Sequence, residues 1–138
     1  MNSPLLALDI GLKRTGVALS ESGLLAQPLG VIEWQLPHAH TLINEVIDHL
    51  KKYDIRTLIV GMPYGEDEEP TSQALKTDHI ITQIEEKIAA ERLAVEVTRV
   101  NEFGSTQDGT VLFPNTDKDA AAAALLLQDY IEQHGGSW

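Results

Sequence analysis

The chain has 138 residues, of which 43% are hydrophobic, and it carries a formal net charge of −11 at pH 7. This length and composition predict one globular domain over residues 1–138 and exclude a disordered chain. The absence of cysteine excludes disulfides and thiolate metal sites. The acidic charge argues against a broad nucleic-acid-binding surface, because phosphate binding usually needs a basic footprint.

Two features of the sequence concern location. No apolar run approaches the length of a membrane span. The start of the chain, Asn2-Ser3-Pro4, lacks the positive charge of a signal peptide. We therefore expect a cytoplasmic protein without a membrane partner, present as a monomer or a homodimer.

Residues 5–20, LLALDIGLKRTGVALS, begin with an apolar run that ends in Asp9. Gly11 and the basic pair Lys13-Arg14 follow, and a second run of small and apolar residues comes next. This pattern predicts a buried strand, a tight turn and a return strand. A carboxylate at the end of a buried strand is costly to desolvate, so Asp9 is either a solvated turn residue or a metal ligand.

The rest of the chain continues with a strand that Pro28 marks as an edge strand or a bulged one. Apolar spacing predicts the following order: a strand over 24–33, a helix over 40–53, a strand over 55–60, a helix over 71–92, a strand over 93–100, a loop over 101–116 and a helix over 119–133. Three strands followed by alternating helices and strands predict an α/β domain, with a mixed sheet and helices on its faces.

Three acids stand at the ends of predicted elements, namely Asp9, Glu102 and Asp119. Functional groups gather at the carboxyl ends of parallel strands. Carboxylates without cysteine suit hard cations such as Mg²⁺ or Mn²⁺. Two such ions bridged by an aspartate could activate water to hydrolyse a phosphodiester. The alternative for the last helix is that Asp117 or Asp119 only caps its start.

Residues 8–20, LDIGLKRTGVALS, resemble the opening motif of the YqgF/RuvX family, whose members are described as Holliday junction resolvases or pre-16S rRNA nucleases. Further segments match in order, AQPL at 26–29, LIVGMP at 58–63 and the last helix over 119–131. The resemblance covers nearly the whole chain. It implies a ribonuclease H-like fold, with a mixed five-stranded sheet, and metal-dependent nuclease chemistry.

The resemblance also implies roles for individual residues. Asp9 would bridge two Mg²⁺ or Mn²⁺ ions, with Glu102 as the second acid and Asp119 as the third. Lys13 and Arg14 fall in the basic turn of the family. Together with Lys118, they are the candidate substrate-binding residues.

The chain departs from the family pattern after the strand over 93–100. Where the family usually has Asp-Glu-Arg, this chain has Asn101-Glu102-Phe103. Lys118 is the sole cation between Glu102 and Asp119. The loop over 65–70 is acidic as well. Much of the expected basic surface for substrate is therefore missing.

Two functions of different classes follow. The first is a phosphodiester hydrolase acting on structured nucleic acid, with RNA favoured through pre-16S rRNA maturation and branched DNA as the alternative substrate. The second is a catalytically weakened family member that acts as a binding or regulatory module. An ATP-binding fold of the actin and sugar-kinase type shares the hairpin, but the chain is too short for its two domains.

Overall fold

The computed structural model describes residues 3–11, 13–35, 38–63, 72–101 and 113–134. Its elements follow the predicted order of strands and helices. In chain order they are β1 (Leu5–Ile10), β2 (Arg14–Ser20), β3 (Gln27–Glu33), α1 (Ala39–Lys52), β4 (Thr57–Met62), α2 (Ser72–Ala90), β5 (Glu96–Asn101) and α4 (Lys118–Gln133). Most of the predicted loop over 101–116 lies outside the described residues, and Asn101 belongs to β5.

The sheet has five strands in the order β3-β2-β1-β4-β5. The β1–β2 and β2–β3 pairs are antiparallel, whereas β1, β4 and β5 are parallel to one another. The mixed sheet is therefore as predicted. The three parallel strands end at the same side of the sheet, which we call the carboxyl edge, and β2 begins there. Pro28 lies in edge strand β3, where the β2–β3 register shifts between Val17 and Ala18.

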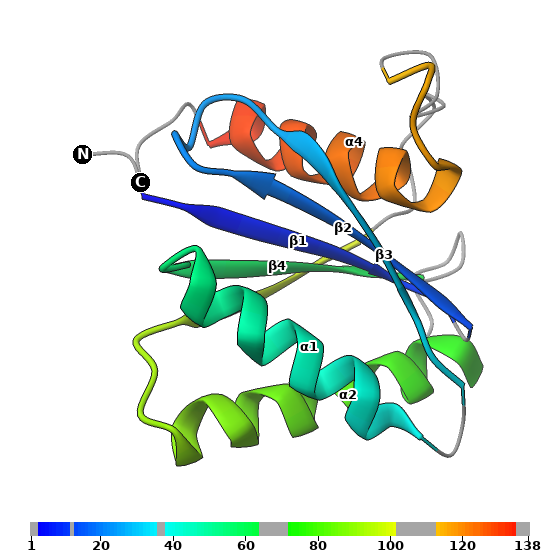
Figure 1. Ribbon diagram of the computed structural model, residues 1–138, viewed down its shortest axis with the longest axis vertical. Coiled ribbons are helices and arrows are strands. Elements are labelled where there is room, and N and C mark those ends of the chain that lie inside the picture. Colours follow the sequence, from blue (N-terminus) through cyan, green and yellow to red (C-terminus); the bar gives the residue numbers. More distant parts are fainter. Residues whose placement is uncertain (1–2, 12, 36–37, 64–71, 102–112, 135–138) are drawn as a thin grey trace.

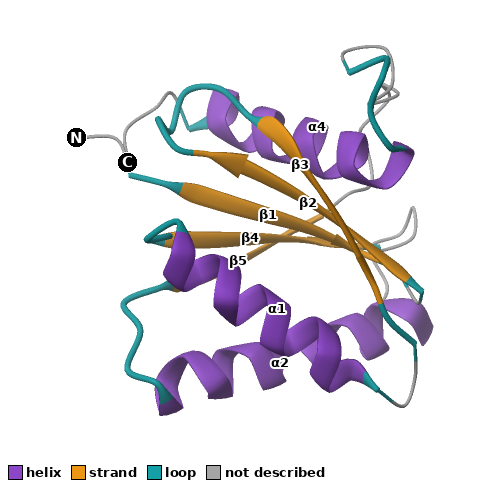
Figure 2. Cartoon of the chain, viewed as in Figure 1, coloured by secondary structure: helices purple, strands orange, loops and turns teal. Residues whose placement is uncertain are grey.

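Helices cover both faces of the sheet (Figure 1). Helices α1 and α2 lie on one face and α4 lies on the other, so the chain forms three layers (Figure 2). Side chains alternate along β1 accordingly. Leu6 and Leu8 belong to the core under α1 and α2, and Leu5 and Ala7 belong to the core under α4. None of the helices in the described ranges is long and apolar enough to cross a membrane.

Helix α4 begins directly on top of β2. A Cβ placed on Gly16 would lie 1.8 Å from the main-chain oxygen of Asp119 and 3.1 Å from the nitrogen of Ala120. No residue with a side chain fits there without moving the helix. Small residues continue this close approach along α4, where Ala123 and Ala124 are fully buried against the sheet.

The β1–β2 turn is fixed at both of its sides. The Gly11 N–H donates to the Arg14 main-chain oxygen at 2.9 Å, which closes the turn. On the neighbouring strand, the Trp34 main-chain N–H donates to the Lys13 oxygen at 3.0 Å. The Trp34 indole N–H donates to the buried Thr15 hydroxyl, also at 3.0 Å. The carboxyl edge is therefore rigidly built where β2 and β3 meet.

Candidate active site

Asp9 lies near the end of β1 and is half-buried. By alternation it shares the α4 face of the sheet with Leu5 and Ala7. Its partner across the β1–β2 ladder is Gly16. Because the start of α4 rests on Gly16, the main chain of Asp119 lies over the position next to Asp9. Two of the three predicted acids thus lie at neighbouring positions on one face of the sheet.

The cap of α4 is Asp117 and not Asp119. The Asp117 Oδ1 atom accepts the Asp119 main-chain N–H at 2.8 Å. Asp119 is the second residue of α4. Its side-chain carboxylate instead accepts a hydrogen bond from the Arg14 Nε–H, with 2.7 Å between the heavy atoms. The sequence left open which of these two aspartates caps the helix, and the structure assigns this position to Asp117. Asp117 stabilises the helix start, and the Asp119 carboxylate points to the β1–β2 turn.

Arg14 is surrounded by carboxylates. Besides Asp119, it forms an ion pair with Asp117 through Nη2, and its Nη1 atom lies 3.6 Å from Glu33 Oε1. The hydrogen bond to Asp119, followed by that to Asp117, raises the pKa of Arg14 above its ordinary value. The Asp119 N–H and then Arg14 lower the pKa of Asp117. A candidate substrate-binding residue and a candidate metal ligand, predicted in separate roles, therefore form an ion pair.

The other predicted site residues are Lys13, Lys118 and Glu102. Among the described residues, neither lysine forms an ion pair with Asp9 or Asp119. Lys13 lies exposed in the β1–β2 turn, and Lys118 is the exposed first residue of α4. Glu102 lies outside the described residues. Within the part of the chain that the structure describes, no group of three or more His, Asp or Glu side chains is arranged to hold a metal ion.

The donor chemistry nevertheless fits a hard divalent cation. Asp9 and Asp119 supply carboxylate oxygens, the ligands that Mg²⁺ and Mn²⁺ prefer. The Asp119 carboxylate already has a positive charge beside it, the guanidinium of Arg14. A metal ion at Asp119 would therefore compete with Arg14 for this carboxylate. The described residues provide two of the three predicted ligands.

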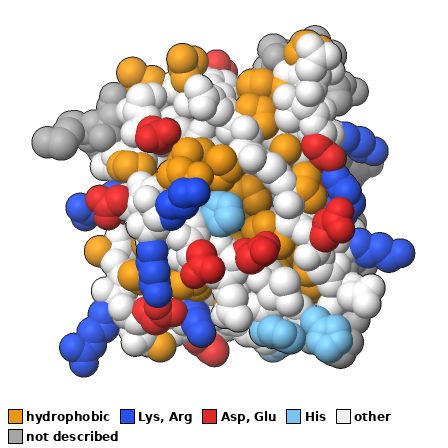
Figure 3. Space-filling model, in the orientation of Figure 1, with side chains coloured by type: hydrophobic (Ala, Val, Ile, Leu, Met, Phe, Trp, Pro, Cys, Tyr) orange, Lys and Arg blue, Asp and Glu red, His pale blue; other side chains and the backbone are white. Residues whose placement is uncertain are grey.

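Charge at the carboxyl edge is mixed. Among the described residues there, three cations stand among four acids, namely Lys13, Arg14 and Lys118 among Asp9, Glu33, Asp117 and Asp119. Figure 3 shows the same pattern more widely, with Lys and Arg side chains interspersed among Asp and Glu side chains on the face in view. The described residues on this face form no continuous basic surface. Nucleic acid would therefore meet individual cations rather than a basic stripe.

A cavity of about 600 Å³ adjoins this site between the β1–β2 turn and the start of α1, and we call it the turn cavity. Its walls include Lys13, Arg14, Trp34, Gln35, His38 and Thr41. Sequence reasoning did not single out Gln35, His38 or Thr41 as site residues. The available signal was the position of His38 just before a predicted helix, but its closeness to Lys13 arises only through the β2–β3 pairing.

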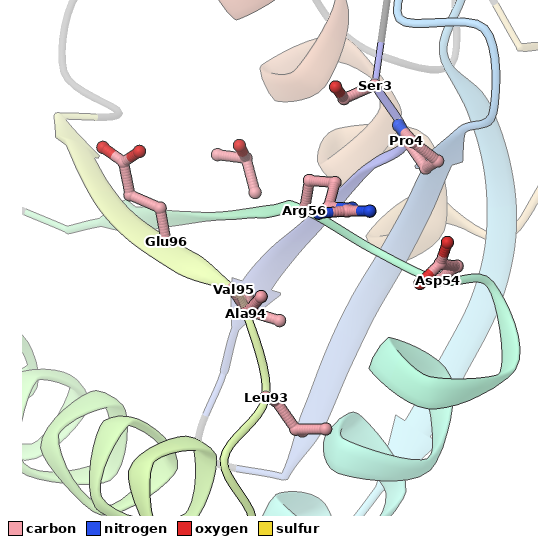
Figure 4. A pocket seen from close by; sticks show the side chains of 9 residues that line it. Ser3, Pro4, Asp54, Arg56, Leu93, Ala94, Val95 and Glu96 are labelled. Carbon is pink, nitrogen blue, oxygen red and sulfur yellow. The ribbon is translucent and has the colours of Figure 1, made fainter.

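A second cavity, of about 700 Å³, lies at the opposite edge of the sheet, where β4 and β5 begin. Figure 4 shows Pro4 and Arg56 on one side of it and the segment from Leu93 to Glu96 on the other. None of the predicted site residues lines this cavity. Its size alone gives it no part in the candidate site.

Comparison with known proteins gives a family match along the chain. The family model described as "RuvX: Holliday junction resolvase" matches residues 3–133. A protein of Campylobacter lari named "Putative pre-16S rRNA nuclease" is 36% identical over 131 residues, covering 91% of this chain and 94% of that protein. A protein of the same name from Aster yellows witches'-broom phytoplasma is 27% identical over 139 residues, covering 95% and 90%.

Solved structures match the fold at low sequence identity. Thermus thermophilus RuvC has a TM-score of 0.66 at 14% identity, with 97% of each chain covered. The same protein in complex with a Holliday junction substrate gives 0.63 at 14% identity, covering 98% of this chain and 97% of that one. The yeast mitochondrial Holliday junction resolvase gives 0.60 at 10% identity, covering 98% and 80%. The predicted ribonuclease H-like fold is therefore confirmed.

Proposed function

The chain belongs to the RuvX family, and from this premise we propose that it is a metal-dependent nuclease that hydrolyses phosphodiester bonds in structured nucleic acid. Pre-16S ribosomal RNA is the favoured substrate, because the similar proteins carry that name. Branched DNA is the alternative, after the description of the family. A role in ribosomal RNA maturation implies action in the cytoplasm.

One observation carries the proposal. Asp9 and Asp119 come from opposite ends of the chain, yet they lie at neighbouring positions because α4 starts on Gly16, the cross-strand partner of Asp9. A helix that served only to cover the sheet would need no such approach at its charged first turn. Two acids at neighbouring positions of the carboxyl edge support metal-dependent phosphoryl chemistry there.

We assign the following roles. Asp9 and Asp119 would hold Mg²⁺ or Mn²⁺ together with Glu102, the third acid that the family resemblance implies. Such ions, when bound, supply an activated water and neutralise developing charge on the phosphate. Arg14 orients the Asp119 carboxylate through its Nε–H. Lys13 is free to contact a substrate phosphate.

The test is a cleavage assay on the full chain. An RNA carrying the precursor ends of 16S rRNA and a four-way DNA junction are incubated with Mn²⁺, Mg²⁺ or EDTA. We expect metal-dependent cleavage that Asp9→Asn abolishes, because the exchange removes the charge and keeps the shape. The matched control is Asp48→Asn, which alters an exposed aspartate of α1. Equal cleavage by Asp9→Asn and by the control would refute the assignment.

The second candidate is a binding module without catalysis. It is favoured by the excess of acids at the carboxyl edge and by the ion pair that already occupies Asp119. Under this alternative the protein would bind nucleic acid or a protein partner, but neither Mn²⁺ nor Mg²⁺ would produce cleavage. Calorimetric titration with Mn²⁺ distinguishes the two functions, because only the nuclease needs Asp9-dependent metal binding.

A further inference from the structure

Arg14 cannot easily serve as the main phosphate contact. Its guanidinium already contacts Asp119, Asp117 and Glu33, so a phosphate would have to displace carboxylates from it. Lys13, the residue before it, is exposed and forms none of the ion pairs among the described residues. The available positive charge at the turn is thus the Lys13 ammonium, on the side of the turn cavity.

The turn cavity adjoins the candidate active site at Arg14. This side chain contacts Asp119 and also lines the cavity, so it lies between Asp119 and the cavity. Trp34 gives the cavity a fixed wall, since its main chain is bonded to Lys13 and its indole to Thr15. A strand that reaches the acids at the carboxyl edge can therefore continue into a preformed hollow.

Several side chains in the walls of the turn cavity can donate hydrogen bonds. Lys13 contributes an ammonium, Gln35 an amide and Thr41 a hydroxyl, and the exposed His38 contributes an imidazole. The His38 side chain makes no capping hydrogen bond to α1. The acid in the lining is Glu33, which lies within ion-pair distance of Arg14. Such a lining suits a ligand with several anionic acceptor oxygens.

Two further cavities lined by described residues have a different charge pattern and position. The cavity between β3 and α1, of about 390 Å³, has Glu45 and Asp48 in its wall. The cavity at the opposite edge has Asp54 and Glu96 around Arg56 and lies away from the candidate acids. Of these three cavities, the turn cavity is the one that adjoins the candidate site and carries a cation outside the described ion pairs, Lys13.

We propose that the turn cavity binds a backbone phosphate of the nucleic acid strand next to the bond that is cut, through Lys13 and His38, with Gln35 and Thr41 as neutral donors. This inference rests on the proposed nuclease function and extends it to a second contact point. The strand passes from the acids over Arg14 into the cavity. Substrate binding would then depend on Lys13 in the β1–β2 turn and on residues between the end of β3 and the first turn of α1, none of which is acidic.

Binding is tested with a fluorescein-labelled single-stranded RNA in Mg²⁺, using full-length protein in an Asp9→Asn background to prevent cleavage. Lys13→Ala and His38→Ala are compared with Lys87→Ala and His79→Ala, which alter exposed residues of α2. We expect both cavity variants to weaken binding and both controls to bind unchanged. Lys13→Ala should also reduce the slope of log K against log salt by about 0.7, the value for one phosphate contact on a single strand.

Cleavage by the same variants with Asp9 intact separates the two proposals. A higher KM with unchanged kcat for Lys13→Ala and His38→Ala supports the cavity as a binding subsite. If the wild type cleaves RNA and the cavity variants bind and cleave as the controls do, the proposed phosphate-binding role of the cavity is refuted. The proposed nuclease function is then unaffected. If the cavity variants lose RNA binding but neither the wild type nor any variant cleaves, the cavity is supported as a binding site and the nuclease function is refuted. If the Asp9→Asn protein without a cavity substitution binds no RNA, the proposed phosphate-binding role of the cavity is refuted.

Discussion

The main-chain oxygen of Asp119 occupies the space in which a side chain on Gly16 would begin. This contact joins the last described helix to the second strand and sets the position of one candidate acid relative to the other. It is backbone against backbone, so no rotation of a side chain can relieve it. The placement of Asp119 beside Asp9 therefore depends on the absence of a methyl group at position 16.

Gly16→Ala should accordingly destabilise the protein and separate the acids. The added Cβ would lie 1.8 Å from the Asp119 oxygen, so the start of α4 must move outward. We expect a loss of about 1–3 kcal/mol in the free energy of unfolding, as is typical of overpacked sites. Urea denaturation measures this loss, and Mn²⁺ titration should show weaker binding. Unchanged stability and unchanged Mn²⁺ affinity would contradict the proposed geometry.

Arg14→Gln should make the protein less stable without metal and more responsive to Mn²⁺. The variant loses the cation that contacts Asp119 and Asp117, so these carboxylates repel each other more strongly. The same loss removes a competitor of the metal ion that we propose binds at Asp119. We therefore expect a lower Tm in EDTA and a larger rise in Tm on adding Mn²⁺ than in the wild type.

The matched control for this prediction is Arg56→Gln, because Arg56 is exposed at the opposite edge of the sheet. It should leave the Mn²⁺-induced rise in Tm unchanged. A smaller rise in the Arg14 variant than in the control would mean that Arg14 helps metal binding, and our view of competition would be wrong.

Acid should weaken the start of α4 through Asp117. Its pKa in the folded state is lower than the ordinary value of 3.8, because its carboxylate accepts the Asp119 N–H and then a hydrogen bond from Arg14. The folded state therefore binds fewer protons than the unfolded state. The stabilisation is fully present above the unfolded pKa and is lost as the pH falls through the lower, folded pKa.

Asp117→Asn tests this pH dependence. Asparagine keeps a capping oxygen but does not titrate. The wild type should melt at a higher temperature than the variant above the ordinary pKa of 3.8, and the difference should shrink below it. Thermal melting over a pH series measures the difference. A difference that stays constant across the series would show that the charge of Asp117 does not contribute.

Thr15→Val should leave the indole N–H of Trp34 without its partner in a buried position. Thr15 is fully buried and Trp34 is 6% exposed. An unpaired buried donor costs about 1–3 kcal/mol. The double variant with Trp34→Phe removes the donor as well, so the two effects should be less than additive in chemical denaturation. Strict additivity would mean that the hydrogen bond contributes nothing to stability.

Local patterns were sufficient to predict the elements, because alternation and helical spacing each depend on a few neighbouring residues. Pro28 correctly indicated an edge strand. The ion pair of Arg14 with Asp119 could not be predicted, since it joins residues 105 positions apart and depends on how α4 crosses the sheet. The choice of Asp117 as the cap depends on where the helix begins, and the sequence left two aspartates open. Glu102 remains a prediction.

The position of Asp119, a residue late in the chain, close to the β1–β2 hairpin has a consequence for biosynthesis. Synthesis runs from the N-terminus, so the β1–β2 hairpin emerges from the ribosome long before α4 is translated. Until α4 docks on Gly16, Asp119 has no place beside Asp9. The two candidate acids therefore come together only after α4 has been translated and has docked on β2.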